Sequence, residues 1–186
     1  MDDDELLRLA SQLGAALKSR GLKMTLAESC TGGMASQFVT AVAGSSAWFD
    51  CGFVTYSNAA KQHLLGVPEA TLIEHGAVSE QTAYAMALGA ISNSRADIAA
   101  SITGIAGPSG GTATKPIGTV CFAFAFKNRQ MPEAANTQLS HLAANQTNLQ
   151  VITRTICFTG NRDAIRKQSV TQTLESLITL TLSLDL

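Results

Sequence analysis

The strongest constraint on the fold is an alternation of strand-like and helix-like segments along the chain. Short stretches rich in apolar, aromatic and β-branched residues are typical of strands, and five of them occur: 23–28, 48–57, 97–104, 117–126 and 151–158. Strands that alternate with helices predict an α/β domain with helices layered on a partly parallel sheet. Because the last two strands follow one another without a helix between them, we expect some antiparallel pairing. The predicted fold is a layered α/β/α sandwich with a mixed sheet.

Helical spacing of apolar residues marks the segments between these strands. The predicted helices are 4–20, 31–42, 59–66, 78–94 and 160–178. Gly21 suits the end of the first helix, and Asn58 and Ser79 are candidate N-caps for the third and fourth. The sequence shows no internal repeat and no linker, so we expect residues 1–186 to form a single domain.

Two segments near the carboxyl end are ambiguous by pattern. Residues 128–150 are polar and rich in Asn and Gln, with a weak strand pattern at 137–142, and we expect a surface hairpin with no functional role. The tail 178–186 alternates with period two, as a strand would. We expect it to be helical, because it continues the apolar face that Val170 and Leu174 begin.

The composition limits the classes of partner. Charged residues make up 15% of the chain, against about 25% in an average soluble protein. Since a weakly charged surface does little to keep copies apart, we expect a homo-oligomer, with a dimer favoured. Thirteen basic and fourteen acidic residues give a net charge of −1 with no long basic run, which argues against nucleic-acid binding.

The sequence also bears on where in the cell the protein is found. The acidic opening MDDDELLRLA is unlike a secretory signal. No apolar run approaches the ~18 residues of a membrane span. We therefore expect a soluble, cytoplasmic protein that does not bind membranes.

The cysteines and histidines do not suggest a metal or redox centre. The four cysteines are scattered without a C-x-x-C pair, and the three histidines lack metal-ligand spacing. We expect reduced thiols that are mostly packed inside, and neither a metal nor a cofactor.

The stretch LAESCTGGMASQF, residues 26–38, places polar residues and two glycines where a strand turns into a helix. Such a turn exposes backbone N–H groups that, with the helix dipole, favour a negative charge. Ser29 beside these donors suits a nucleophile whose substrate carbonyl becomes an oxyanion. We expect the oxyanion donors among Cys30, Thr31, Gly32 and Gly33. The plainer interpretation is that Ser29 or Thr31 simply caps the helix.

A hydroxyl nucleophile also needs a base, and no histidine stands in a suitable motif. The stretch VTYSNAAKQ offers Tyr56 and Lys61, and Lys61 could act as a base if burial or positive charge lowered its pKa. The plainer interpretation of this pair is a tyrosine at a strand end and a solvated lysine. Cys30 is a rival nucleophile without an obvious cation to form its thiolate. The role of Glu28, as an orienting group or a turn cap, stays open at this point.

A glycine-rich loop follows the third predicted strand in SITGIAGPSGG. It matches neither the P-loop nor the dinucleotide-binding pattern. Its backbone N–H groups could nevertheless hold a phosphate, and we expect Thr103, Gly104, Gly107 and Gly110 to enclose the ligand. An ordinary turn is the alternative.

The motifs taken together resemble the C-terminal domain of the competence/damage-inducible protein CinA. They run in order from AESCTGG through GSSAWF, GFVTYSNAAK, HGAVSE, SITGIAGPSGG and KPIGTV to CFTGNRDAIR. Three positions depart from the pattern expected of the family, namely Ala60, Ser109 and Asn161. None of them removes a candidate catalytic group.

This resemblance implies a metal-independent hydrolysis of nicotinamide mononucleotide to nicotinate mononucleotide and ammonia, in pyridine-nucleotide salvage. The roles that the family assigns to a serine nucleophile, a lysine and a tyrosine fall on Ser29, Lys61 and Tyr56. The resemblance further implies that the nucleotide-hydrolysing domain of larger CinA proteins is absent. Two alternatives remain: a non-catalytic module that binds a nucleotide or protein, and an amidase for another nucleotide-like amide.

Overall fold

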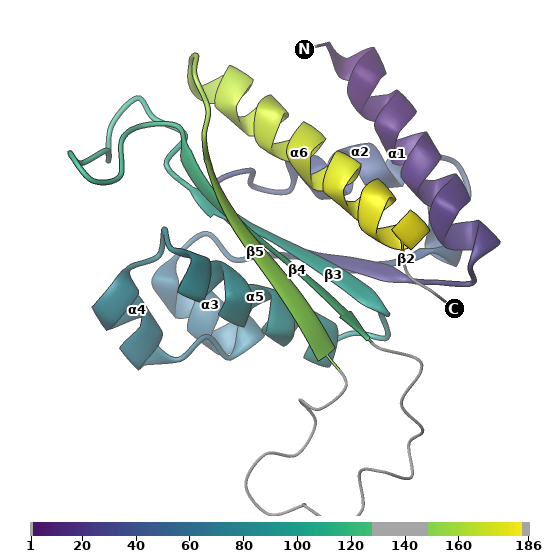
Figure 1. The fold of residues 1–186 in the computed structure, drawn as a ribbon, viewed down its shortest axis with the longest axis horizontal. Helices are drawn as coiled ribbons and strands as arrows, with labels where there is room; N and C mark the ends of the chain where they lie inside the picture. Colours follow the sequence, from purple (N-terminus) through teal and green to yellow (C-terminus); the bar gives the residue numbers. More distant parts are fainter. Residues whose placement is uncertain (1, 128–148, 184–186) are drawn as a thin grey trace, which may run out of the picture.

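A computed structural model describes residues 2–127 and 149–183 of the protein, and their fold is an α/β sandwich (Figure 1). A single five-stranded sheet has the order β2-β1-β3-β4-β5. Its strands are β1 (Met24–Glu28), β2 (Phe49–Val54), β3 (Ile98–Gly104), β4 (Thr119–Lys127) and β5 (Leu149–Cys157). β1 runs parallel to both β2 and β3, whereas β4 is antiparallel to both β3 and β5. The predicted mixed sheet and the antiparallel pairing of the last strands are confirmed.

The helices form a layer on each face of this sheet (Figure 1). They are α1 (Asp3–Ser19), α2 (Met34–Thr40), α3 (Asn58–Leu65), α4 (Glu69–His75), α5 (Glu80–Ser92) and α6 (Arg162–Ser183), with a 3-10 turn at Ser45–Ala47. The helices α1, α2 and α6 lie on one face, and α3, α4 and α5 lie on the other. No helix among the described residues is long and apolar enough to cross a membrane.

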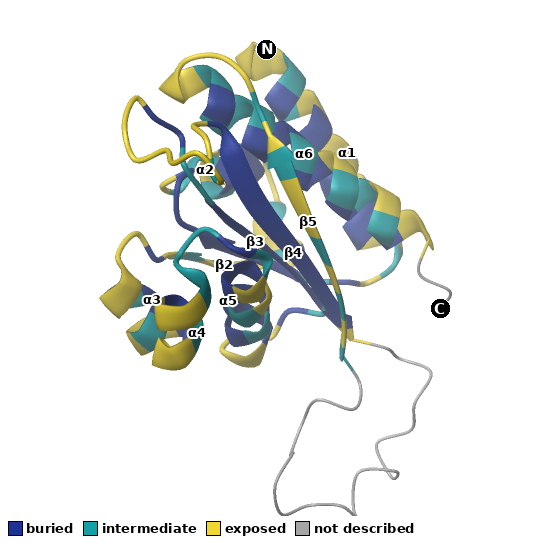
Figure 2. Cartoon of the chain, turned by 60° about the vertical axis from the view of Figure 1, so that its left-hand side comes forward, coloured by how far each residue is buried: buried dark blue, intermediate teal, exposed yellow. Residues whose placement is uncertain are grey.

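Each face of the sheet carries its own apolar core. The core under α1 and α6 includes Leu13, Phe122 and Leu174, and the core under α5 includes Met86 and Ala123. The central strands β3 and β4 are buried along almost their whole length (Figure 2). A strand covered on both faces reads as a continuous apolar run, and this explains why the segment around 117–126 is a strong strand pattern.

Several predicted boundaries change in the structure. Helix α2 starts at Met34 rather than at residue 31, because Gly32 and Gly33 have φ values of 60° and 94°. Such left-handed residues lie outside a right-handed helix. Asn58 is not an N-cap as expected: Ser57 caps α3 by accepting a hydrogen bond from the Ala60 N–H.

Two other predictions have different outcomes. Helix α4 was not predicted at all, because its seven residues are too few to show clear helical periodicity. The helical interpretation of the tail is confirmed as far as Ser183, where α6 ends. The weak strand pattern at 137–142, and most of the proposed hairpin at 128–150, lie outside the described residues.

The sheet topology gathers four chain segments at one edge. β1, β2, β3 and β5 point in the same direction, so the segments that follow them leave the sheet at the same side. These segments are the ESCTGG turn, the loop into α3, the glycine-rich loop and the start of α6. In open α/β sheets, ligands bind outside the carboxyl ends of parallel strands. We therefore expect the functional site at this edge of the sheet.

A close approach between two helices sets the position of α3 there. A Cβ on Gly89 of α5 would lie only 2.0 Å from the carbonyl oxygen of Leu65 at the end of α3. Glycine at this position therefore lets the backbones of α3 and α5 touch. Since Lys61 lies on α3, the contact between α3 and α5 helps to set the position of the buried Lys61 side chain.

Candidate active site

The structure brings two of the predicted catalytic residues into direct contact. Ser29 follows β1 and Lys61 lies on α3, yet Lys61 Nζ donates a hydrogen bond of 2.9 Å to Ser29 Oγ. Both residues are buried, with exposed fractions of 7% and 1%. A nucleophile and a base within hydrogen-bond reach form the geometric signature of an activated hydroxyl.

Lys61 lies in a setting that disfavours its charge. Burial lowers the pKa of Lys61, and the neighbouring Cys30 acts weakly in the opposite direction. Besides Ser29, its amine donates to the main-chain carbonyls of Thr55 at 2.9 Å and Tyr56 at 3.5 Å. No carboxylate forms an ion pair with it among the described residues. A lowered pKa makes the neutral amine, the form that can accept a proton, more accessible.

Cys30 does not have the surroundings of a reactive thiolate. Its side chain is buried, and burial raises the pKa of its thiol to about 12, with Glu28 adding to the effect and Lys61 opposing it. The thiolate is the nucleophilic form of cysteine. Of the two adjacent candidates for a nucleophile, this geometry favours Ser29 over Cys30.

The turn after Ser29 contains both engaged and unengaged backbone donors. The Gly32 N–H donates to the Ser29 carbonyl at 3.1 Å, and the Gly33 N–H donates to a carboxylate oxygen of Glu28 at 3.0 Å. Within the described residues, the N–H groups of Cys30 and Thr31 donate to no main-chain carbonyl of another residue. Of the four predicted oxyanion donors, these two have no partner from another residue, and both residues are buried, with exposed fractions of 6% and 0%.

Tyr56, the third predicted catalytic residue, has a different position. It is 63% exposed, and its hydroxyl accepts a 3.0 Å hydrogen bond from Nη2 of Arg162. Its side chain forms no hydrogen bond with Ser29 or Lys61 within the described chain, so only its main-chain carbonyl meets the lysine. Tyr56 therefore belongs to the rim of the site rather than to its buried floor.

Two arginines near the start of α6 were not predicted as site residues. Arg162 Nη1 donates to the Gly107 carbonyl at 2.7 Å, and Arg166 Nη2 donates to the Thr31 carbonyl at 2.6 Å. The missed signal was topological, because β5 runs parallel to β3 and delivers the start of α6 to the same edge. The stretch GNRDAIR alone does not show this.

The glycine-rich loop is brought to the site only in part. Gly107, with φ of 79°, lies beside Arg162, whereas Gly110 is in an exposed part of the loop. The buried Thr103 hydroxyl donates to the Ala77 carbonyl. A Cβ on Gly104 would lie 2.7 Å from the Thr119 carbonyl oxygen, so close packing against β4 accounts for this glycine.

The model of the CinA C-terminal domain family matches residues 6–146, more than half of the chain. The chain belongs to the CinA C-terminal domain family.

Relatives within and around this family cover most of the chain. It is 49% identical over 177 residues to a nicotinamide-nucleotide amidohydrolase PncC of Escherichia coli K12, covering 95% of both proteins. The corresponding protein of Enterobacter agglomerans is 47% identical, with 96% of both covered. A CinA-like protein of Syntrophobacter fumaroxidans is 56% identical over 62% of this chain and 27% of that protein.

Solved structures of the same superfamily have the same fold. The competence/damage-inducible protein CihA of Agrobacterium tumefaciens aligns with a TM-score of 0.82 at 40% identity, covering 97% of this chain and 96% of that one. A competence damage-inducible protein of Klebsiella pneumoniae aligns with a TM-score of 0.83 at 33% identity, covering 97% and 99%. The α/β architecture is thus that of the CinA superfamily.

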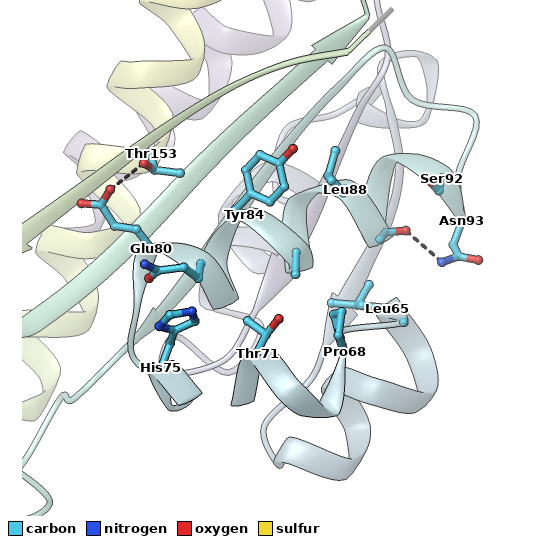
Figure 3. Close-up of a pocket in the computed structure, with 14 residues that line it drawn as sticks. Leu65, Pro68, Thr71, His75, Glu80, Tyr84, Leu88, Ser92, Asn93 and Thr153 are labelled. Atoms are coloured by element: carbon cyan, nitrogen blue, oxygen red, sulfur yellow. Dashed lines mark hydrogen bonds between the residues drawn. The ribbon is translucent and has the colours of Figure 1, made fainter. Parts of the chain in front are cut away.

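A cavity of about 680 Å³ lies elsewhere in this CinA domain, between α5 and the α3–α4 segment (Figure 3). Tyr84, His75 and Pro68 are among its lining residues, and none of the predicted site residues lines it. Glu80 at one end accepts hydrogen bonds from Thr153 and Thr155 of β5. No group of three or more His, Cys, Asp or Glu side chains in 2–127 and 149–183 is arranged to hold a metal ion.

Proposed function

We propose that this protein is an amidohydrolase that converts nicotinamide mononucleotide to nicotinate mononucleotide and ammonia. The relatives named for nicotinamide-nucleotide hydrolysis are 47–49% identical over nearly the whole chain, which supports the substrate class. The observation that carries the chemistry is the 2.9 Å contact between Ser29 Oγ and the buried Lys61 Nζ. A serine activated by a neutral lysine suits attack on a carboxamide.

The first half of the reaction forms an ester on the protein. Neutral Lys61 takes the proton of the Ser29 hydroxyl as Oγ attacks the carboxamide carbon. The carbonyl oxygen becomes an oxyanion and is stabilised by the free N–H groups of Cys30 and Thr31. The C–N bond then breaks, the Lys61 ammonium returns its proton to the leaving nitrogen, and ammonia departs.

The second half releases the product by the same groups. Neutral Lys61 takes a proton from a water molecule that attacks the ester carbonyl, and the same two N–H groups hold the second oxyanion. The ester bond breaks as the Lys61 ammonium returns its proton to Ser29 Oγ, and the carboxylic acid that forms loses its proton to water, so nicotinate mononucleotide leaves as a carboxylate. Tyr56 supports this cycle from the rim, where its carbonyl contacts Lys61 and its hydroxyl holds Arg162.

The rim also suits the phosphate of a mononucleotide. Arg162 presents an exposed guanidinium beside Gly107, and planar guanidinium groups bind phosphate oxygens well. We assign the phosphate to Arg162 and the Gly107–Gly110 part of the loop. Thr103 and Gly104 lie within β3, where they bond to Ala77 and pack against β4, so we assign no ligand contact to them.

Ammonia release from nicotinamide mononucleotide by the purified protein tests this function. We expect the wild-type protein to form nicotinate mononucleotide and Ser29→Ala to lose at least about 1000-fold in kcat/KM. Ser169→Ala is the control, because Ser169 is also buried but its hydroxyl donates to the Ile165 carbonyl of its own helix. A wild-type protein that binds the nucleotide without turnover would contradict the proposal and favour the binding-module alternative.

A substrate comparison separates the remaining alternative, an amidase for a different nucleotide-like amide. Nicotinamide mononucleotide, nicotinamide riboside and free nicotinamide share the carboxamide but differ in the phosphate and ribose. We expect kcat/KM to be highest for the mononucleotide. Equal or higher values for the compounds without phosphate would overturn the substrate assignment while leaving the Ser29 chemistry intact.

The expectation of a homo-oligomer is also retained as a proposal. The low charge content supports it, as does the exposure of large apolar side chains such as Ile73 at 79% and Ile152 at 47%. Light scattering at micromolar concentration should give the mass of a dimer. A monomer mass across the accessible concentration range would contradict it.

A further inference from the structure

Glu28 is a buried carboxylate directly next to the nucleophile in the chain, and hydrogen bonds satisfy both of its oxygens. It is the last residue of β1 and is 0% exposed. One of its carboxylate oxygens, Oε2, accepts from the N–H groups of Gly33 at 3.0 Å and Ala35 at 3.1 Å. The other, Oε1, accepts from the N–H and the hydroxyl of Ser36, at 2.8 and 2.7 Å.

These four donors come from the start of α2 rather than from a cation. A buried carboxylate is costly unless hydrogen bonds satisfy its oxygens, and here each oxygen receives two. The donors that begin a helix normally point to solvent, a cap or a ligand. In this protein Glu28 takes them, so the start of α2 is not available to a substrate anion, contrary to the expectation from sequence.

The same residue is linked to both reacting groups through the main chain. Its carbonyl accepts from the Thr55 N–H at 2.8 Å, and the carbonyl of Thr55 in turn accepts from Lys61 Nζ at 2.9 Å. On the other side, Glu28 is bonded directly to Ser29, whose N–H donates to Ile102 of β3 at 2.9 Å. Glu28 is thus connected to Ser29 by a peptide bond, to Lys61 through Thr55, and to the start of α2 through its carboxylate.

From this arrangement we infer that Glu28 is a positioning residue for the Ser29 reaction. Glu28 holds the turn 29–33 at both ends. Its main chain is bonded covalently to Ser29 at one end, and its carboxylate accepts a hydrogen bond from the Gly33 N–H at the other. Held in this way, the turn keeps Ser29 beside Lys61 and leaves the N–H groups of Cys30 and Thr31 without a partner from another residue. This inference rests on the proposed amidase function, and it assigns to Glu28 a role in the transition state rather than in substrate binding.

The replacement Glu28→Gln tests this role with little change in size. Its side-chain amide offers one oxygen and one NH₂ group, and the NH₂ group would face two donors that need an acceptor. We expect a fall of about 100-fold in kcat, the size of effect that a misplacement of about 1 Å produces, with KM changed by less than threefold.

Two control variants separate positioning from loss of stability. Ser36→Ala removes only the hydroxyl bond to Oε1 and leaves the three N–H bonds, so kcat should stay within about fivefold of wild type. Val39→Ala opens a small cavity under the same helix without touching Glu28, so it should lower the melting temperature but leave kcat unchanged well below that temperature.

The outcomes distinguish this inference from the function on which it rests. If the wild-type protein releases no ammonia, the proposed function fails. If the wild type is active and Ser29→Ala is not, but Glu28→Gln keeps at least a third of the wild-type kcat, only the role of Glu28 is refuted. A Glu28→Gln variant that raises KM as much as it lowers kcat, or that loses no more activity than a Val39→Ala variant of equal melting temperature, would refute it as well.

Discussion

The floor and the rim of the site are built in different ways. The floor, formed by Glu28, Ser29 and Lys61, is buried, and short contacts to main-chain groups hold each residue. The rim, formed by Tyr56 and Arg162, is exposed, and one contact between two long side chains joins them. We therefore expect the floor to keep its geometry when a substrate binds and the exposed side chains of the rim to adjust to it. We expect substitutions in the floor to affect kcat and those in the rim to affect KM.

The largest effect after loss of Ser29 itself should come from Lys61. Lys61→Ala removes the base, and general bases typically contribute 100- to 10,000-fold, so we expect kcat to fall by about 1000-fold. Lys167→Ala is the control, since Lys167 is an ion-paired lysine on α6 that bonds to Asp3. A Lys61→Ala variant with kcat within tenfold of wild type would show that Lys61 is not the general base.

The pH profile of the wild type sharpens the same point. Only the neutral amine can take the proton, so kcat/KM should fall as the pH falls through the pKa of Lys61. Since burial lowers that pKa below the ordinary 10.5, the inflection should lie at a correspondingly lower pH. A profile that is still rising at pH 10.5 would show that the lysine is not held neutral.

Arg162→Ala should have the largest effect within the rim. A hydrogen bond to a charged group contributes about 1.5–3 kcal/mol, so we expect KM for nicotinamide mononucleotide to rise roughly 10- to 100-fold with little change in kcat. Nicotinamide riboside lacks the phosphate, and its kcat/KM should not change in the variant. Equal losses for both compounds would mean that Arg162 does not meet the phosphate.

A smaller effect is expected for Tyr56→Phe, which removes the acceptor that Arg162 uses. Arg162 keeps its bond to the Gly107 carbonyl, so KM should rise by only about two- to fivefold. Tyr84→Phe, at an exposed tyrosine on α5 in the other cavity, is the matched control and should leave KM unchanged. A large loss in kcat for Tyr56→Phe would place the hydroxyl in the chemistry and blur the boundary between floor and rim.

The smallest effect should follow from replacing Cys30. With a pKa of about 12 the thiol stays protonated at neutral pH, so Cys30→Ala should keep kcat within about twofold. Iodoacetamide should modify the exposed Cys157 much faster than Cys30 in a mass-spectrometric time course. Rapid modification of Cys30 with parallel loss of activity would reverse the choice of nucleophile.

The sequence could predict what depends on local pattern and on residue type. The strands, the helix layers on both faces of the sheet and the antiparallel end follow from periodicity and connection, and the motifs single out Ser29 and Lys61 as candidates. Helix α4 could not be predicted, because the seven residues that follow Pro68 are too few to show helical periodicity. The start of α2 was misplaced because the left-handed conformation of Gly32 and Gly33 is visible only in the structure.

The rest of the site depends on contacts between distant segments. Arg162 meets Tyr56 across 106 positions of the chain, and only the direction of β5 brings them together. The role of Glu28 could not be decided from AESCTGG, because a cap and an anchor require the same residue type there. The choice of Cys30 and Thr31 as oxyanion donors required knowing which neighbouring N–H groups were already bonded.

The central claim is that Ser29 attacks the substrate with Lys61 as its base, and the covalent ester is its most direct consequence. The measurement is an acid quench of the protein during turnover of nicotinamide mononucleotide, followed by proteolysis and mass spectrometry. We predict the nicotinate mononucleotide acyl group on the peptide that contains Ser29, and no adduct in Ser29→Ala. An acyl group on Cys30 or another residue, or undiminished turnover by Ser29→Ala, would contradict the account.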